Sequence, residues 1–431
     1  MFEEARGKKL LIIGAETNIM HIVTQAKEMG VYTIVTERGS DYSTTSAKSI
    51  ADEAWDIDYS DLETLVQQSQ RVGINGVISG YSEGKVLYAA RLSQLLQTPF
   101  YVTPEQIELT RNKRHFKELC SEYGVPIPID YCPSGSIDSL DRNAIKYPVI
   151  VKPADYGGRI GITICHCEEE IDNALDLAKR NSLTGTVVVE EYLKGIELTA
   201  IYTIADGEIS LSIINDKYLS EEGNHYACLC DFAITPSKFY QLYLNSIDAP
   251  IKNLLRGIGV SNGLAGFQFI EKNGIIYAFE MGLRLNGGND WQLLSAHNGI
   301  NHMKMLINYS LTGTMGDSLE KDNPIIEGYM ATYVMYVHSG VIGSFTYSGI
   351  EGHRNILDMM PFVHIGKSIP DTRTTQQRLI SFKIRSETLE EMAETIRFIQ
   401  ERVHVKDANG RSLMFSLFDT KRLKNEYGKR V

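Results

Sequence analysis

The first hundred residues alternate short apolar runs with segments of helical periodicity. The apolar runs are of strand length and cover residues 9–15, 32–35, 54–57 and 76–79. The helical stretches that follow three of them cover residues 18–29, 61–72 and 82–97. This alternation predicts βαβ units and a parallel sheet. The first turn, Gly14-Ala15-Glu16-Thr17-Asn18, lacks the Gly-x-Gly-x-x-Gly pattern that lets a pyrophosphate approach the backbone. We therefore expect a Rossmann-like domain without its cofactor.

The pattern becomes mixed after residue 103. Strand-like runs cover residues 148–152 and 186–193, and a hairpin around Asp206-Gly207 joins 198–205 to 209–214. Helical periodicity covers residues 105–123, 168–179, 289–311 and 388–402. We therefore expect α/β and α+β architecture, with the α+β part following the N-terminal domain.

Residues 267–282 form the most informative segment. Lys272-Asn273-Gly274 between two apolar runs is typical of a β-hairpin turn. Such a hairpin would place Gln268 and Glu280 on neighbouring strands, facing one space. An amide oxygen beside a carboxylate suits a hard cation such as Mg²⁺, and Arg284 could hold phosphoryl oxygens. An ordinary strand whose Glu280 pairs with Arg284 fits this segment equally well.

Composition and charge exclude several classes of function. A chain of 431 residues with 43% hydrophobic residues is long enough for about three domains. The net charge of −11 and the absence of a basic stripe argue against a nucleic-acid binder. No run of about 18 apolar residues predicts a membrane span, and the N-terminus does not resemble a secretory signal. We expect a soluble, cytoplasmic protein.

Two further segments contain candidate phosphate-binding chemistry. Lys152 ends a buried strand just before a loop with three glycines, including Gly158, and its ammonium could reach a phosphate. A lysine at a strand end beside an ordinary turn is the simpler alternative. The segment 80–85 is one residue short of a phosphate loop, so we expect Ser82 to cap the next helix. Glu83 then favours the helix dipole or faces a substrate.

These segments together resemble the ATP-grasp superfamily. The resemblance rests on the order Asn112-Lys113, Lys152 with its glycine loop, residues 189–197, Gln268, Glu280 and Arg284. It covers roughly residues 8–314 and includes features of L-amino-acid ligases and carbamoyl phosphate synthetase. It implies a Rossmann-like pre-ATP-grasp domain at 1–103, an ATP-grasp domain at 104–314 with a mobile lid at about 133–198, and a small C-terminal closing domain at 315–431.

The resemblance also implies a role for each motif residue. Lys113, Lys152 and the loop at Gly158 would hold the ATP phosphates. The main chain from Glu191 to Leu193 would bind the adenine edge with Glu190 close by, and Glu197 would accept from the ribose. The metal, Mg²⁺ with Mn²⁺ as an alternative, would be held by Gln268 and Glu280. Arg284 would stabilise the transferred phosphoryl group, with Asn286 beside it.

Two positions depart from the superfamily pattern. Many members have Glu where this chain has Gln268, although carbamoyl phosphate synthetase also has Gln there. The superfamily usually has Asn two residues after the second metal ligand, where this chain has Gly282. Asn286 is a candidate to supply the missing oxygen. The departures leave ATP binding as the expectation and bear mainly on metal affinity.

The resemblance implies carboxylate–amine ligation through an acylphosphate, releasing ADP and phosphate, with small-molecule carboxylate and amine substrates. Arg284-Leu285-Asn286-Gly287-Gly288 resembles the Arg-Leu-Gly-Gly segment of L-amino-acid ligases, and its glycines precede a helix whose N–H groups could bind a carboxylate. The alternatives are an ATP-dependent carboxylase using bicarbonate and a non-catalytic nucleotide-binding protein. A homodimer is the ordinary default for a soluble enzyme.

Overall fold

The N-terminal part of the chain is a parallel sheet flanked by helices. The computed structural model describes residues 2–39, 42–155, 160–220, 229–288, 290–372, 374–415 and 417–427. The sheet order β3-β2-β1-β4 joins β1 (Lys9–Ile13), β2 (Tyr32–Thr36), β3 (Glu53–Trp55) and β4 (Gly76–Ser79). Every pairing in it is parallel. The connecting helices are α1 (Ile19–Glu28), α2 (Leu62–Val72) and α3 (Glu83–Leu96). The predicted Rossmann-like alternation is confirmed.

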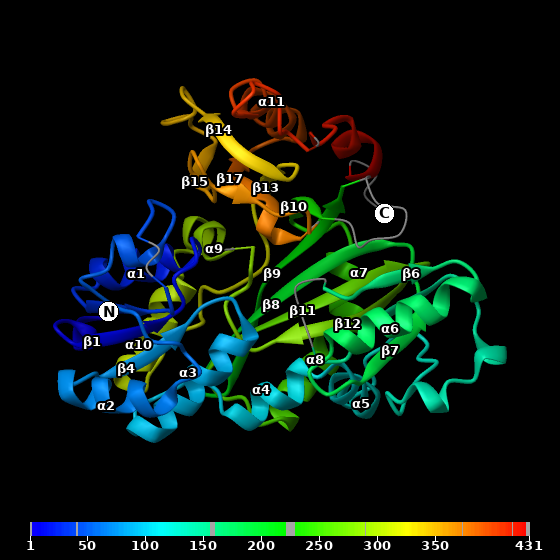
Figure 1. Ribbon diagram of the computed structural model, residues 1–431, viewed down its shortest axis with the longest axis horizontal. Helices are drawn as coiled ribbons and strands as arrows, with labels where there is room; N and C mark the ends of the chain where they lie inside the picture. The colour runs from blue at the N-terminus through cyan, green and yellow to red at the C-terminus, as the bar shows by residue number, and fades with distance from the viewer. Residues whose placement is uncertain are drawn as a thin grey trace.

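A large antiparallel sheet forms the centre of the molecule (Figure 1). Its strand order is β12-β11-β8-β9-β10-β13-β17-β15. The strands are β8 (Ile196–Ala205), β9 (Glu208–Leu219), β10 (Cys230–Thr235), β11 (Gly263–Lys272), β12 (Ile275–Gly282), β13 (Tyr329–Tyr336), β15 (Ile356–Pro361) and β17 (Arg378–Ser386). Strands from the central and C-terminal segments therefore share one continuous sheet.

The hairpin predicted at residues 267–282 is present. β11 and β12 pair antiparallel, and Gln268 lies directly opposite Glu280. The turn has φ of 54° at Asn273 and 81° at Gly274. Two consecutive positive φ angles are the requirement of a type I′ turn, which Asn-Gly satisfies with little strain. The turn sets a register that pairs Phe269 with Ala278, and a β-bulge at Phe279 then shifts the pairing so that Gln268 meets Glu280.

A smaller unit lies at the right of Figure 1 and has its own core. Its sheet order is β6-β5-β7, and it contains β5 (Val149–Pro153), β6 (Thr163–Cys165), β7 (Val187–Glu191) and α6 (Ile171–Asn181). Buried apolar residues of α6, such as Leu175, share a cluster with Val149 and Val189 of the strands. A separate core is what a lid moving as one body requires, although the lid and the domain boundaries stay predictions.

Three predicted helices have different limits. The stretch 105–123 is two helices, α4 (Pro104–Arg111) and α5 (Lys113–Glu122). The break is Asn112, whose backbone is extended and whose side chain accepts from the N–H of Arg114 at 3.0 Å. The stretch 289–311 is α9 (Trp291–Asn298) and α10 (His302–Thr312), separated at Gly299 with φ of 84°. Residues 168–170 form a 3₁₀ turn before α6. In each case a local cap or turn interrupts the apolar periodicity.

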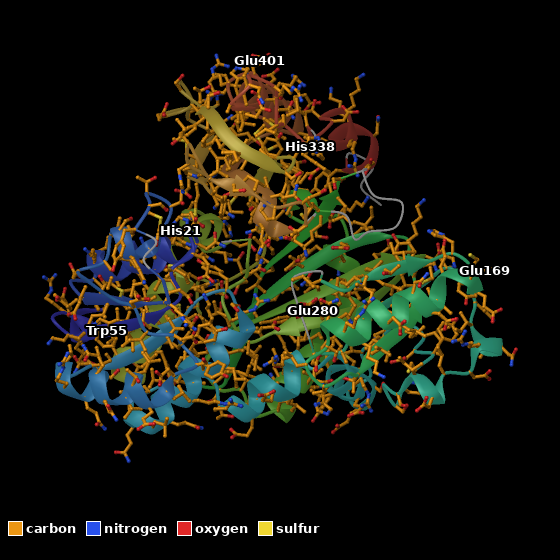
Figure 2. All side chains as sticks on the ribbon, viewed as in Figure 1. His21, Trp55, Glu169, Glu280, His338 and Glu401 are labelled. Carbon is orange, nitrogen blue, oxygen red and sulfur yellow. The ribbon has the colours of Figure 1, made fainter. Side chains whose placement is uncertain are left out.

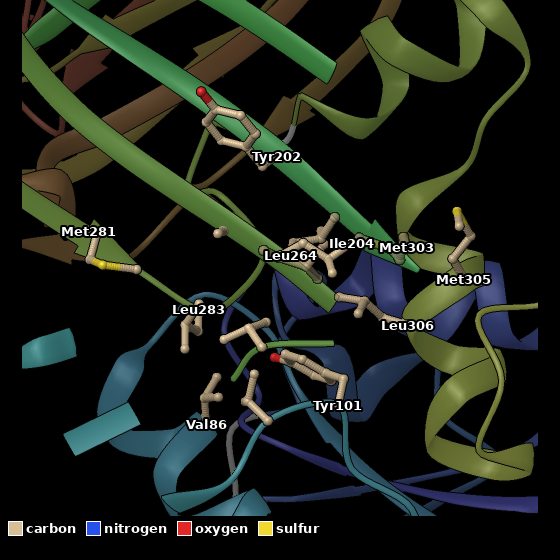
Figure 3. Close-up of a cluster of buried hydrophobic side chains, with 14 of the residues drawn as sticks. Val86, Tyr101, Tyr202, Ile204, Leu264, Met281, Leu283, Met303, Met305 and Leu306 are labelled. Carbon is tan, nitrogen blue, oxygen red and sulfur yellow. The ribbon is translucent and has the colours of Figure 1, made fainter. Parts of the chain in front are cut away.

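The main hydrophobic core joins segments that are far apart in the chain (Figure 3). Val86 and Tyr101 from the N-terminal part meet Tyr202 and Leu264 of the large sheet and Leu306 of α10. The opposite face of the N-terminal sheet has its own cluster around Ile34 and Leu92. Consequently the N-terminal sheet is anchored against the strands that carry the candidate site.

The C-terminal strands pack against α11 (Leu389–Gln400). Tyr333 and Phe382 of β13 and β17 share a buried cluster with Ile396 of this helix. A further three-stranded sheet, in the order β16-β14-β18, consists of β14 (Gly340–Thr346), β16 (Ser368–Ile369) and β18 (His404–Asp407). Within the described residues, no helix combines the length and apolar character needed to cross a membrane.

Candidate active site

A cavity of about 510 Å³ lies over one face of the large sheet. Glu280, which lines it, lies near the middle of the molecule in Figure 2. Every predicted site residue in the described ranges lines this cavity: Lys113, Lys152, Glu190, Glu191, Leu193, Glu197, Gln268, Glu280, Arg284 and Asn286. Gly158 lies outside the described residues. Residues spread over some 170 positions of sequence are thus brought together by the fold.

Cross-strand registry arranges oxygen-bearing side chains in a row across the large sheet, at and beside this cavity. Glu280 lies opposite Gln268, Gln268 opposite Thr199, and Thr199 opposite Asn215. Directly opposed residues of antiparallel strands point to the same face. The hydroxyl of Thr199 and the amide oxygen of Asn215 are buried without a hydrogen bond. Buried polar atoms of this kind mark a place where a ligand, ion or water completes the bonding.

Glu190 is the centre of a buried charge cluster. Its carboxylate forms ion pairs with Lys152 of β5 and with Lys117 of α5, the latter at 2.5 Å. Lys117 also lies 2.9 Å from Asp130. Burial alone raises the pKa of Glu190, but the two ammonium groups hold it at about 2. Burial lowers the pKa of Lys152 even though Glu190 opposes this shift. Glu190 therefore positions the lysine predicted to contact phosphate.

The residues at and after the end of β7 line the same part of the cavity. Glu191 lies opposite Val149 of β5 and pairs with Lys272 at 2.8 Å, in a partly exposed contact. Leu193 is buried and Glu197 is the second residue of β8. Lys113, the first residue of α5, donates its backbone N–H to the Ala154 carbonyl at 2.9 Å. This bond attaches α5 to the end of β5, so the two predicted phosphate lysines have linked supports.

A second, smaller cavity of about 20 Å³ adjoins the metal-ligand candidates. Thr199, Gln268, Glu280 and Asn286 line it. A volume of this size accommodates about one water or a small ion, and amide, hydroxyl and carboxylate oxygens are the ligands Mg²⁺ prefers. The donor set therefore fits Mg²⁺. No cluster of three or more His, Cys, Asp or Glu occurs in the described part of the chain, so a metal here would draw other ligands from substrate and water.

Lys217 is an additional cation in this row. It extends from β9 and donates to the amide oxygen of Gln268 at 2.9 Å. It also lies opposite Glu197 in the β8–β9 pairing. The amide oxygen of Gln268 has two lone pairs, so it can accept from Lys217 with one and still offer the other to a ligand. If position 268 were Glu, it would add a negative charge here; with Gln268, the positive charge of Lys217 is not offset by this side chain.

Gly282 is explained by its neighbours. A Cβ at this position would lie 2.7 Å from a carboxylate oxygen of Glu83 and 3.3 Å from Nε of Arg284. Those two side chains form an ion pair of 3.2 Å. The alternative in which Arg284 pairs with Glu280 is therefore wrong, because Glu83 of the N-terminal part is its partner. Burial raises the pKa of Glu83, and Arg284 opposes that shift.

The segment after Arg284 is held by the C-terminal strands. The ammonium of Lys383, on β17, donates to the Gly288 carbonyl and to the Thr332 hydroxyl, the latter at 2.8 Å. Asn286 donates to Asp290 at 2.5 Å. Asp290 stands at the N-cap position of α9, one residue later than the predicted helix start. The helix therefore begins next to a carboxylate of this chain.

Two sets of sequence relatives match parts of the chain. Residues 134–227 match the family described as D-ala D-ala ligase C-terminus. The carbamoyl phosphate synthase large chain of Clostridium beijerinckii is 25% identical over 311 residues, covering 65% of this chain and 27% of that protein. The D-alanine–D-alanine ligase of Mannheimia succiniciproducens is 31% identical over 135 residues, covering 28% of this chain and 42% of that protein. The chain thus spans well under half the length of these relatives.

Solved structures match almost the whole chain. The L-amino acid ligase from Bacillus licheniformis aligns with a TM-score of 0.77 and 17% identity, covering 93% of this chain and 99% of that chain. In sequence and fold the chain is similar to the ATP-grasp superfamily. The biotin carboxylase domain of Hydrogenobacter thermophilus 2-oxoglutarate carboxylase, solved with MgADP and bicarbonate, aligns with a TM-score of 0.75 and 19% identity, covering 93% of this chain and 90% of that chain.

Sequence reasoning missed several residues associated with the cavity. They are Lys117, Lys217, Asp290, Arg378 and Lys383. Strand alternation could have placed Lys217 on one face with Asn215, and Lys383 on one face with Ser381. It could not have shown which face lines the cavity. Ser82 does occupy the N-cap of α3, but its side chain makes no capping hydrogen bond.

Proposed function

We propose that this protein is an ATP-dependent carboxylate–amine ligase that forms an amide or peptide bond through an acylphosphate and releases ADP and phosphate. The observation that carries the proposal is the pairing of Gln268 with Glu280 in the same cavity as Lys152 and Arg284. Phosphoryl transfer requires mainly positioning and neutralisation of charge. This cavity offers both.

Each residue has a distinct part in the proposed reaction. Lys113 and Lys152 bind the phosphate chain of ATP, and the β7 edge from Glu191 to Leu193 binds the adenine. Gln268 and Glu280 hold Mg²⁺, which supplies positive charge against the phosphate oxygens when bound. Arg284 stabilises the phosphoryl group as it passes to the carboxylate substrate.

The ligase reading is favoured by the segment 284–288 and by the fold shared with the L-amino acid ligase. The resemblance to the carboxylase domain makes bicarbonate the competing acid. A homodimer also belongs to this proposal, since that carboxylase domain is described as a dimer. A nucleotide-binding protein without turnover is the third possibility that the experiment must address.

The test is ADP release with Mg·ATP and three acid supplies: an amino-acid mixture, bicarbonate, and neither. Glu280→Gln should reduce the rate at least about 100-fold while the fold stays intact, because it removes an anionic metal ligand. Arg284→Ala should lower the rate more than the ATP affinity. Glu208→Gln, at an exposed hairpin end outside the cavity, is the matched control.

The outcomes separate the three functions. Release that depends on amino acids and is lost in Glu280→Gln supports the ligase. Release driven by bicarbonate alone makes the protein a carboxylase. Folded wild-type protein that binds ATP without any release favours the non-catalytic alternative, and equal turnover in Glu280→Gln and wild type refutes the site.

A further inference from the structure

The cavity extends well beyond the residues that ATP and metal would occupy. The part of the cavity that we name the C-terminal end is lined by Cys230, Val334, Tyr336, Phe362, Arg378 and Ser381. Except for Phe362, these residues lie on the adjacent strands β10, β13 and β17. Apolar and aromatic surface dominates this end, and Arg378 is the charged residue among them. A pocket of this composition suits a ligand with an apolar body and one anionic group.

A β-bulge places Arg378 on the cavity side. Val334 lies opposite Ser381 and Met335 opposite Ile380, but Tyr336 lies opposite Arg378. One residue of β17, Leu379, is therefore left out of the pairing, and its side chain is fully buried in the C-terminal core. A bulge shifts the alternation of side chains by one position and commonly re-aims a residue beside a binding site. In regular pairing, Arg378 would be on the core side with Ile380.

Arg378 lacks an acidic partner in the described part of the chain. The ion pairs found there include none with Arg378, and its Nε is buried without a hydrogen bond. The guanidinium lies 5.6 Å from the centre of the Phe362 ring. The hydroxyl of Tyr336 beside it donates to the Cys230 carbonyl at 3.1 Å. An anionic ligand in the cavity would complete the bonding of this half-buried guanidinium.

The charges near Arg378 include both signs, since Asp231 raises the pKa of the neighbouring Tyr336. Lys383 lies on the same strand, and its pKa is lowered to about 8 first by burial and also by the charge of Arg378. Asp290, 3.9 Å from the ammonium of Lys383, and Asp358 both raise the pKa of that lysine. Arg378, which forms no ion pair within the described residues, is therefore the group at the C-terminal end of the cavity that would attract an anion.

We propose that Arg378 binds the carboxylate of the amine substrate, so that the nucleophile is an α-amino acid with an apolar side chain. This inference rests on the proposed ligase function and specifies its second substrate. A planar guanidinium binds a carboxylate through two parallel hydrogen bonds. Val334 and Phe362 contact the apolar side chain. A phosphate dianion would need more donors than this apolar surface provides.

The reaction that follows is balanced without a further reagent. The amine nitrogen attacks the acyl carbon of the acylphosphate, and a C–N bond forms. The bond from that carbon to the phosphate oxygen breaks, and phosphate leaves with the electron pair. The nitrogen loses a proton that phosphate can accept. The product is an N-acylated amino acid whose free carboxylate remains at Arg378.

The test is calorimetric binding of L-phenylalanine and L-phenylalaninamide to the full chain with Mg·ADP present. The two probes differ only in the carboxylate. Wild type should bind the amino acid about 10- to 100-fold more tightly, as expected for a charge-assisted contact. Arg378→Met should remove this preference, and Arg378→Lys should retain part of it. Arg385→Met, an exposed guanidinium on the same strand, should leave it unchanged.

A second arm separates the two candidate carboxylate sites. Arg284→Ala should keep the preference for the amino acid if that carboxylate lies at Arg378. Loss of the preference in Arg284→Ala but not in Arg378→Met would overturn the proposal, as would equal binding of the two probes by wild type. Selective binding without ADP release would refute the ligase function while leaving the anion site established. The proposal is supported if the preference for the amino acid is lost in Arg378→Met but kept in Arg284→Ala, and is partly restored in Arg378→Lys.

Discussion

The two ends of the cavity differ in how their charges are compensated. Toward β7 and β12, charged side chains have partners within the chain: Lys152 and Lys117 with Glu190, Lys272 with Glu191, and Arg284 with Glu83. Toward β13 and β17, Arg378 has no acidic partner in the described ranges. The first end is assembled before any ligand arrives, whereas the second needs an anion from outside.

The contrast indicates two ways of preparing a binding site. Where each charge is paired with an opposite charge, the ion pairs hold the side chains in place before a ligand binds. A ligand can then replace one partner of an ion pair. A cation without an acidic partner lowers the stability of the folded chain but binds an anionic ligand more strongly. Mutations should therefore affect folding at the first end and ligand affinity at the second.

The largest expected effect is that of Lys152→Met. Removing one cation from the buried cluster leaves Glu190 and Asp130 with Lys117 alone, and breaking such a pair costs about 3–5 kcal/mol. ATP affinity should fall as well. Urea unfolding and ATP calorimetry measure the two effects. Lys272→Met, which breaks a half-exposed pair, should change the unfolding free energy by less than about 1 kcal/mol. Equal effects of the two substitutions would erase the distinction between buried and exposed pairs.

An intermediate effect should appear on acidification. The pKa of Glu190 is about 2 in the folded chain against an ordinary value of 4.5. A depressed carboxyl pKa contributes stability above the ordinary value, and the contribution disappears as pH falls from about 4.5 to 2. The loss should be about 3 kcal/mol in this window. Unfolding free energies measured at several pH values should show a shallower decline for Glu190→Gln than for wild type. Parallel declines would assign the acid sensitivity to other carboxyls.

The smallest effect on folding should be that of Arg378→Met. No acid in the described residues loses its partner, and the methionine side chain retains contact with Phe362. The unfolding free energy should therefore stay within about 1 kcal/mol of wild type. Chemical denaturation beside Lys152→Met provides the comparison. A destabilisation as large as that of Lys152→Met would show that the C-terminal end depends on its charge for folding.

The local pattern of the chain was sufficient for most of its elements and for one hairpin. Alternating apolar runs and helical stretches predicted the parallel N-terminal sheet, because those periodicities follow from strand and helix geometry. Asn273-Gly274 predicted the hairpin, but a β-bulge at Phe279 is also needed to place Gln268 opposite Glu280. Helix ends were less predictable, since Asn112 and Gly299 interrupt periodic stretches through capping and backbone conformation.

Tertiary structure decided which charges meet. Glu83 and Arg284 are 201 positions apart, and no local pattern shows that their pairing occupies the space beside Gly282. The bulge in β17 likewise depends on pairing with β13, so alternation within β17 could not place Arg378 in the cavity. Sequence periodicity identifies the face of an element, but long-range packing determines what that face contacts. The candidate ATP and metal residues were therefore predictable as a set of motifs, whereas their ionic partners and the second binding region were not.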